Sequence, residues 1–125
     1  MKLNPDCIRD ILLTVESLMV PDLDGETDYI TVDELSQHPT LSGYQKNEIA
    51  YTVRNLFDEK MLKSGKTYIH ETIPHIVDIT SKGVQFIEAT KLDSIWSKTK
   101  SILSSVASIT ATKLLESAIS IALNQ

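Results

Sequence analysis

Helix-start signals, spread along the chain, set the strongest limit on how it can fold. One of them is followed by Pro5, a residue that suits the first position of a helix. Two others are followed three residues later by Glu34 and Gln45, the spacing of a capping box, in which two side chains bond the free N–H groups at a helix start. The predicted N-cap residues are, in chain order, Asn4, Thr31, Ser42, Thr80 and Asp93.

Hydrophobic patterns between these signals distinguish helices from strands. The first helix has apolar residues at helical spacing and should end before Pro21, whereas the third has a shorter stripe made by Ile49, Val53 and Leu56. Residues 29–31 are β-prone, and residues 66–72 and 75–80 alternate well enough to form two strands joined around residues 72–74. Residues 81–92, a segment beginning near 94, and residues 111–124 are predicted to be helical.

Before the final segment 111–124, the resulting order is helix, strand, helix, helix, strand, strand, helix, helix. The first six elements have the order of a winged helix-turn-helix domain, in which the first strand joins a β-hairpin and the hairpin tip forms the wing. We therefore predict an α+β winged helix-turn-helix domain over residues 1–92, with the predicted wing tip at residues 71–75. Residues 93–125 form a helical C-terminal extension in this prediction.

Charge and cysteine content exclude several classes of protein. The net charge of −5 arises within residues 1–28, which hold two basic and seven acidic residues, so the remainder is neutral. A dedicated nucleic-acid-binding protein usually has a basic face. Cys7 is the only cysteine, which excludes an intrachain disulfide and a multi-cysteine zinc site and suits a cytoplasmic setting. The uncharged segment 101–112 is too short and too rich in serine to span a membrane.

Three stretches of the chain resemble one family of small bacterial proteins, common in prophages and mobile elements and classified as a domain of unknown function. They are MKLNPDCIRDILL at the start, EIAYTVRNLFDEKML in the middle and DITSKGVQFIEATKLDSIWSKTK later. The resemblance implies a winged-helix fold but no catalytic or binding residues. The pattern of Ile79, Thr80 and Gly83 is also similar to the segment after the wing in many regulators. The chain differs from them at Lys60, where a glycine often ends the third helix.

The polar face of the third predicted helix is the candidate for reading DNA. In helix-turn-helix proteins the start of the second helix of the motif contacts base edges, where amide side chains bond adenine and basic ones bond guanine. Two lysines after this helix can contact phosphates. The same residue types are also ordinary on a solvated helix, and acidic neighbours such as Glu48 and Asp58 would repel phosphate. The candidate DNA-binding residues are Gln45, Lys46, Asn47, Tyr51, Arg54, Lys63 and Lys66.

The C-terminal third carries an apolar stripe rich in alanine and serine, which would let helices approach closely. We predict that this stripe forms a homodimer, while packing onto the chain's own domain is the alternative. A helix lying on a membrane would need a basic polar face, and the last segment offers only Lys113. The predicted oligomerisation residues are Ile102, Val106, Ile109, Leu114, Leu115, Ala118 and Ile121.

Two functional hypotheses follow from these patterns. The first is a DNA-binding transcriptional regulator of a prophage or mobile element. The second is a protein-interaction module on a winged-helix scaffold that binds no nucleic acid, because the body is neutral and the predicted wing tip is not basic. The sequence lacks the phosphate-loop, nucleophile-elbow and helical zinc motifs, so we expect no enzymatic activity, cofactor or metal.

Overall fold

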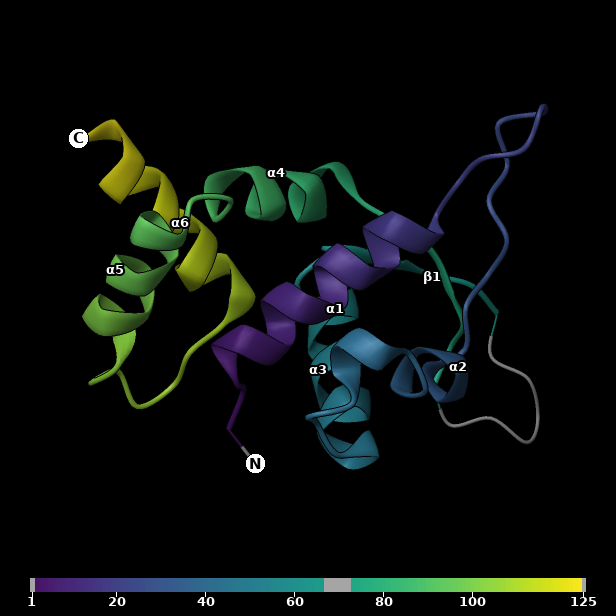
Figure 1. Ribbon diagram of the computed structural model, residues 1–125, viewed down its shortest axis with the longest axis horizontal. Helices are drawn as coiled ribbons and strands as arrows, with labels where there is room; N and C mark the ends of the chain where they lie inside the picture. The colour runs from purple at the N-terminus through teal and green to yellow at the C-terminus, as the bar shows by residue number, and fades with distance from the viewer. Residues whose placement is uncertain (1, 67–72, 125) are drawn as a thin grey trace.

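The computed structural model describes residues 2–66 and 73–124 (Figure 1). This part of the chain is an α+β structure with six α-helices, one 3-10 helix and a two-stranded antiparallel sheet. The elements in chain order are α1 (Pro5–Leu18), α2 (Val32–Ser36), η1 (Pro39–Leu41), α3 (Lys46–Asp58), β1 (Leu62–Ser64), β2 (Ile76–Ile79), α4 (Ser81–Ala89), α5 (Asp93–Leu103) and α6 (Ala111–Leu123).

Three of the five predicted N-caps are confirmed, and two are wrong. The side chains of Asn4, Thr31 and Thr80 each accept a hydrogen bond from a backbone N–H in the first turn of the helix that follows. Ser42 instead follows η1, and α3 begins three residues later than predicted, with Gln45 as an N-cap that makes no side-chain bond. Asp93 is the first helical residue of α5 rather than its cap, where its charge still favours the helix start.

The sheet is smaller than predicted and its first strand begins earlier. Within the described residues β1 covers only Leu62–Ser64, a segment predicted to be a connection, and most of the predicted strand 66–72 lies outside the described residues. β2 lies inside the predicted strand 75–80. Residues 29–31 contribute a single antiparallel bridge, between Ile30 and Ile76. The predicted wing tip, 71–75, is described only from Ile73 onward.

Lys60 ends α3 in the left-handed conformation that glycine usually supplies. Its φ is 62°, the N–H of Lys60 bonds the carbonyl of Phe57 at 3.0 Å, and the N–H of Met61 bonds that of Leu56 at 2.9 Å. These two bonds make a Schellman motif, which satisfies carbonyls that the helix end would leave free. Thr80 stabilises the backbone just after this motif, because its hydroxyl donates to the Lys60 carbonyl at 2.6 Å. The missing glycine therefore leaves the cap intact.

Gly83 allows α4 to pack directly on this turn. A Cβ atom at Gly83 would lie 2.4 Å from the carbonyl oxygen of Met61 and 2.6 Å from a side-chain carbon of Ile79. The spacing of Ile79, Thr80 and Gly83 is thus explained by packing: Thr80 caps α4, and Gly83 lets its first turn approach the end of α3.

The core runs without a break from α1 to α6. α1 crosses the middle of the molecule and contacts α3, α4, β2, η1 and α6, while α6 also packs on α4 and α5 (Figure 1). Lys82 on α4 donates to the carbonyl of Glu59 at 2.9 Å and to the hydroxyl of Thr112 on α6 at 2.8 Å. The division of the chain at residue 92 stays a prediction, and these contacts cross it.

We predict that Lys60→Gly stabilises the protein. The substitution removes the Cβ that makes a left-handed backbone unfavourable, so the free energy of unfolding should rise by about 1 kcal/mol. Lys60→Ala is the matched control, because it removes the same charge but keeps the Cβ. Urea unfolding followed by circular dichroism measures both, and equal stability of the two variants would contradict the strain assigned to Lys60.

Candidate nucleic-acid interface and its surroundings

α3 is oriented by its buried face, which packs against α1 and α2. Its buried residues are Ile49, Thr52, Val53 and Leu56. Four of the predicted DNA-binding residues remain exposed as a consequence: Gln45, Lys46, Asn47 and Arg54. Gln45, Lys46 and Asn47 lie together at the start of the helix, where a helix-turn-helix protein contacts base edges.

The positive charge at the start of α3 is partly neutralised by α2. The ammonium group of Lys46 forms an ion pair with the carboxylate of Asp33, and both side chains are largely exposed. Gln37 donates a long hydrogen bond of 3.4 Å to the other oxygen of Asp33. Exposed ion pairs contribute little stability, so a phosphate group can compete for Lys46 at small cost. Gln45 and Asn47, which flank Lys46 in the sequence, are both exposed.

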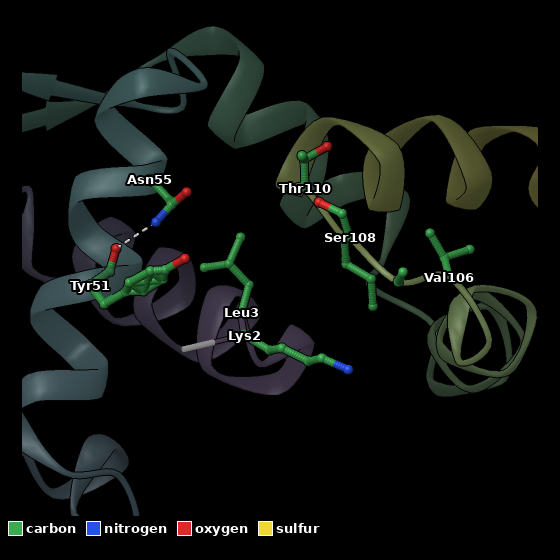
Figure 2. Close-up of a pocket in the computed structure, with 9 residues that line it drawn as sticks. Lys2, Leu3, Tyr51, Asn55, Val106, Ser108 and Thr110 are labelled. Carbon is green, nitrogen blue, oxygen red and sulfur yellow. Dashed lines mark hydrogen bonds between the residues drawn. The ribbon is translucent and has the colours of Figure 1, made fainter.

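Tyr51 differs from the other predicted residues, because it lines a pocket. With Asn55, one turn later on α3, it faces a pocket of about 200 Å³ bounded by Lys2, Leu3 and residues 106–110 (Figure 2). Tyr51 is half-buried, and the amide nitrogen of Asn55 donates to its carbonyl oxygen at 2.9 Å. The structure therefore separates Tyr51 from the exposed residues at the start of α3.

The two predicted phosphate contacts lie on the hairpin and differ in their surroundings. Lys63 is an exposed residue of β1 whose partner across the sheet is Asp78, and both border a shallow hollow that also contains Glu26. Lys66 is exposed at the point where the described chain enters the hairpin connection. These acidic neighbours reduce the attraction of phosphate to Lys63.

The predicted oligomerisation stripe divides into a buried and a more exposed part. Leu114, Leu115 and Ala118 are buried inside the chain, where α6 packs on α5, α4 and α1. Ile102 and Val106 are exposed, while Ile109 and Ile121 are half-buried. Packing onto the chain's own core therefore occupies the centre of the stripe.

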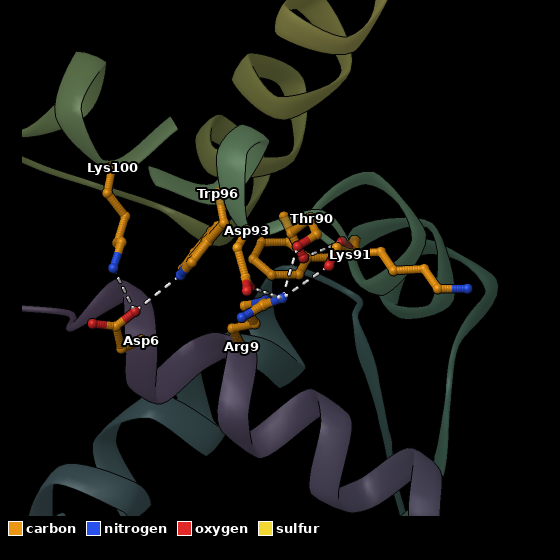
Figure 3. A network of polar contacts seen from close by, with 8 residues as sticks. Asp6, Arg9, Thr90, Lys91, Asp93, Trp96 and Lys100 are labelled. Atoms are coloured by element: carbon orange, nitrogen blue, oxygen red, sulfur yellow. Dashed lines mark hydrogen bonds and ion pairs between the residues drawn. The ribbon is translucent and has the colours of Figure 1, made fainter. Parts of the chain in front are cut away.

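A polar cluster attaches α5 to the start of α1 (Figure 3). The indole N–H of Trp96 donates to the carboxylate of Asp6 at 2.9 Å, and the same oxygen accepts from Lys100 at 3.0 Å. Arg9 donates to the carbonyl of Thr90 at 2.9 Å and lies 5.5 Å from the centre of the Trp96 ring. Partial burial acts to raise the pKa of Asp6, but the hydrogen bonds from Trp96 and Lys100 and the nearby positive charges outweigh it, so that pKa is lowered.

Cys7 is a core residue and not a reactive thiol. It is fully buried, and burial raises the pKa of its thiol to about 11, so the group stays protonated at neutral pH. Nearby, the hydroxyl of Tyr44 donates to Asp10 at 2.7 Å, and burial followed by this interaction raises the pKa of Tyr44.

The three histidines have local roles where they are described. His38 caps η1, since its Nδ1 accepts from the N–H of Thr40, and His75 stacks on Tyr29 with ring centres 4.4 Å apart. His70 lies outside the described residues. Across residues 2–66 and 73–124, no three histidine, cysteine or acidic side chains come close enough together to hold a metal ion. None of the helices described is both long and apolar enough to cross a membrane.

A family model for a hypothetical protein family, DUF2513, matches residues 2–110. The chain belongs to this family. The DUF2513 match covers all seven candidate DNA-binding residues and ends at Thr110, the N-cap of α6. No curated protein and no solved structure matches the chain significantly.

The hydrophobic core extends beyond the residues that the DUF2513 model matches. α6 follows the matched residues, yet its Leu114 and Leu115 belong to the same core cluster as Ile8 and Ile11 of α1. Sequence reasoning missed both the pocket beside Tyr51 and the cluster around Trp96. The only signal for the cluster was the Trp-x-Lys-Thr-Lys run at 96–100, whose Trp and last Lys both bind Asp6.

We predict that Asp6→Asn destabilises the protein only where Asp6 is ionised. The lowered pKa means that the charged carboxylate adds stability above its ordinary value of 3.8, and that this stability is lost as the pH falls through the lower folded-state pKa. Because Asp6 is 51% exposed, solvent screening limits the loss at pH 7 to about 0.2–1 kcal/mol.

Unfolding measurements at pH 7 and at acidic pH test this prediction. The difference between wild type and Asp6→Asn should shrink as the pH drops below 3.8. Asp28→Asn is the matched control, because Asp28 is an exposed residue of the loop between α1 and α2, so the loss of its charge should change stability little. A difference for Asp6→Asn that is constant with pH would show that its charge is not what stabilises the cluster.

Proposed function

We propose that the chain is a DNA-binding protein with a winged-helix fold, and that α3 is its recognition helix. The observation that carries the proposal is the arrangement of α2, η1, α3 and the β1–β2 hairpin, with Ile30 bridging to Ile76 on the outer side of β2. This order and pairing support the proposal, because in a winged-helix domain a first strand joins the hairpin and the hairpin connection forms the wing. A regulator of a prophage or mobile element is the biological setting that the resemblance implies.

In this proposal three exposed residues have separate roles. Asn47 at the start of α3 bonds a base edge, for which an amide side chain suits adenine. Lys46 exchanges its ion pair with Asp33 for a phosphate, and Lys66 contacts a phosphate from the hairpin. Arg54 lies two turns further along α3 and is exposed. Tyr51 no longer belongs to the reading surface, because it lines the pocket.

We predict that the chain binds duplex DNA and that Asn47 and Lys66 contribute in different ways. Selection from random-sequence duplexes, followed by fluorescence anisotropy over a range of salt concentrations, measures both effects. Lys66→Ala should lower the slope of log affinity against log salt by about 0.9, the value for one lost phosphate contact, with any sequence. Asn47→Ala should reduce the preference for the selected sequence by about 1–3 kcal/mol.

Lys98→Ala is the control for a general loss of positive charge, because Lys98 is exposed on α5. If Lys98→Ala lowers the salt slope as much as Lys66→Ala, the hairpin is not a contact site. If the wild-type protein binds no duplex at micromolar concentration and low salt, the proposal is wrong.

A protein-interaction module is the second candidate, favoured by the loop between α1 and α2. This loop extends away from the body (Figure 1) and is ordered at its tip, where the Asp22 carboxylate accepts from the N–H groups of Asp24 and Glu26 at 2.9 and 3.0 Å. Leu23 is fully exposed there, beside acidic side chains. An exposed apolar residue in an acidic loop favours contact with a basic surface of another protein. DNA is disfavoured, because acidic side chains repel its phosphates. Absence of DNA binding in the experiment above would favour this candidate.

Self-association also stays a proposal, with a smaller set of residues. With Leu114, Leu115 and Ala118 in the chain's own core and Val106 and Ile109 lining the pocket beside Tyr51, a second copy would pack on the exposed Ile102 and the half-buried Ile121. A homodimer that binds two DNA half-sites needs its two α3 helices about 34 Å apart, or one helical turn.

We predict that Ile102→Asp converts a dimer into a monomer without unfolding it, since Ile102 is 58% exposed in the single chain. Ser97→Asp, also on an exposed position of α5, is the matched control and should leave the dimer intact. Sedimentation velocity at micromolar concentration gives the mass of each variant. A monomeric wild-type protein under these conditions would contradict self-association.

A further inference from the structure

The pocket beside Tyr51 is built from three separate parts of the chain. Lys2 and Leu3 precede α1, Tyr51 and Asn55 belong to α3, and residues 106–110 connect α5 to α6. Figure 2 shows these side chains around a common space, with Lys2 extending toward the segment that carries Val106. The volume of about 200 Å³ is somewhat larger than the roughly 150 Å³ that holds benzene in an engineered apolar cavity.

Hydrogen bonds fix the walls of this pocket in place. Asn55 donates its amide N–H to the carbonyl of Tyr51 at 2.9 Å, which orients the amide on α3. On the opposite wall, Lys113 donates its ammonium to the carbonyl of Ser108 at 3.1 Å, and its backbone N–H bonds the hydroxyl of Thr110 at 3.1 Å. The connection between α5 and α6 is thereby attached to the first turn of α6. Pre-formed walls of this kind are typical of small-molecule sites.

The chemistry of the lining differs from that of the whole chain. The chain has 17 acidic and 12 basic residues, yet the nine described residues that line the pocket include one base, Lys2, and no acid. Leu3, Val106 and Ile109 provide apolar surface, and the hydroxyl groups of Tyr51 and Ser108 can donate hydrogen bonds. A cation, neutral donors and an apolar wall together favour a ligand that carries one negative charge on a compact apolar body.

From these features we infer that the pocket binds a small organic carboxylate. Lys2 pairs with the carboxylate at the open side, since its side chain is exposed, and a ring or branched body lies against Leu3 and Val106. Tyr51 and Asn55 place the ligand directly on α3. The inference does not require that α3 binds DNA, and its test contains no DNA.

Benzoate is the probe, because it joins one carboxylate to a body of benzene size. We predict saturable shifts of the backbone NMR signals of Tyr51, Asn55 and Ser108 when benzoate is added to the full chain, with a Kd on the order of 1 mM. Benzamide, which has the same shape without the charge, should bind at least about fivefold more weakly, as should benzylamine. Lys2→Gln should weaken benzoate binding by a similar factor.

Two further variants separate the pocket from general effects. Lys98→Gln removes an exposed lysine outside the pocket and should leave the affinity for benzoate unchanged. Val106→Trp, at a position 36% exposed, should fill the pocket and abolish the shifts, with circular dichroism confirming that the variant is folded. If benzoate produces no saturable shift at about ten times the expected Kd, or benzylamine binds as tightly, the inference is wrong. Lys2→Gln decides the matter if Val106→Trp does not fold.

Discussion

The burial of one face of α1 is the interaction on which the rest of the structure depends. Cys7, Ile8, Ile11, Leu12 and Val15 are all fully buried, although they belong to one helix near the start of the chain. α3, α4, η1, β2 and α6 contact this helix, so α1 is their common support. Fully burying an aliphatic side chain contributes roughly 1.5–3 kcal/mol, and none of these elements is large enough to form a core alone. The exposed face of α3 follows from this packing.

The C-terminal helices are attached to α1 by both apolar and polar contacts. Trp96 packs edge-on against Phe86 with ring centres 5.9 Å apart, while its N–H bonds Asp6. A buried or half-buried Trp needs a hydrogen-bond acceptor for its indole N–H. Asp6, in the first turn of α1, is that acceptor. This pairing explains why the apolar stripe on α6 faces inward: once α5 is fixed to α1, the packing of α6 against α5 and α4 directs Leu114 and Leu115 toward the core.

The sequence predicted the features that depend on neighbouring residues and missed those that depend on distant ones. The caps at Asn4, Thr31 and Thr80 need only the next few residues. The capping box at Ser42 failed because Pro39 starts a 3-10 turn that carries the chain further before α3 begins. β1 was missed because three residues are too few to show alternation. The position of Tyr51 in a pocket depends on Lys2, Leu3 and residues 106–110, which no pattern within α3 could reveal.

Charge also depends on residues that are distant in the sequence. These distant residues change which side chains are available to bind DNA. Residues 44–66 hold five basic and three acidic side chains, a small positive excess when counted along the sequence. In the fold, Asp33 of α2 pairs with Lys46, and Asp78 of β2 lies opposite Lys63, so acidic residues from outside this segment offset two of the five. The attraction to a duplex is then weak over long distances, because opposite charges within a Debye length of about 10 Å cancel. DNA binding would therefore depend on short-range contacts at Asn47 of α3 and Lys66 of the hairpin more than on electrostatic steering.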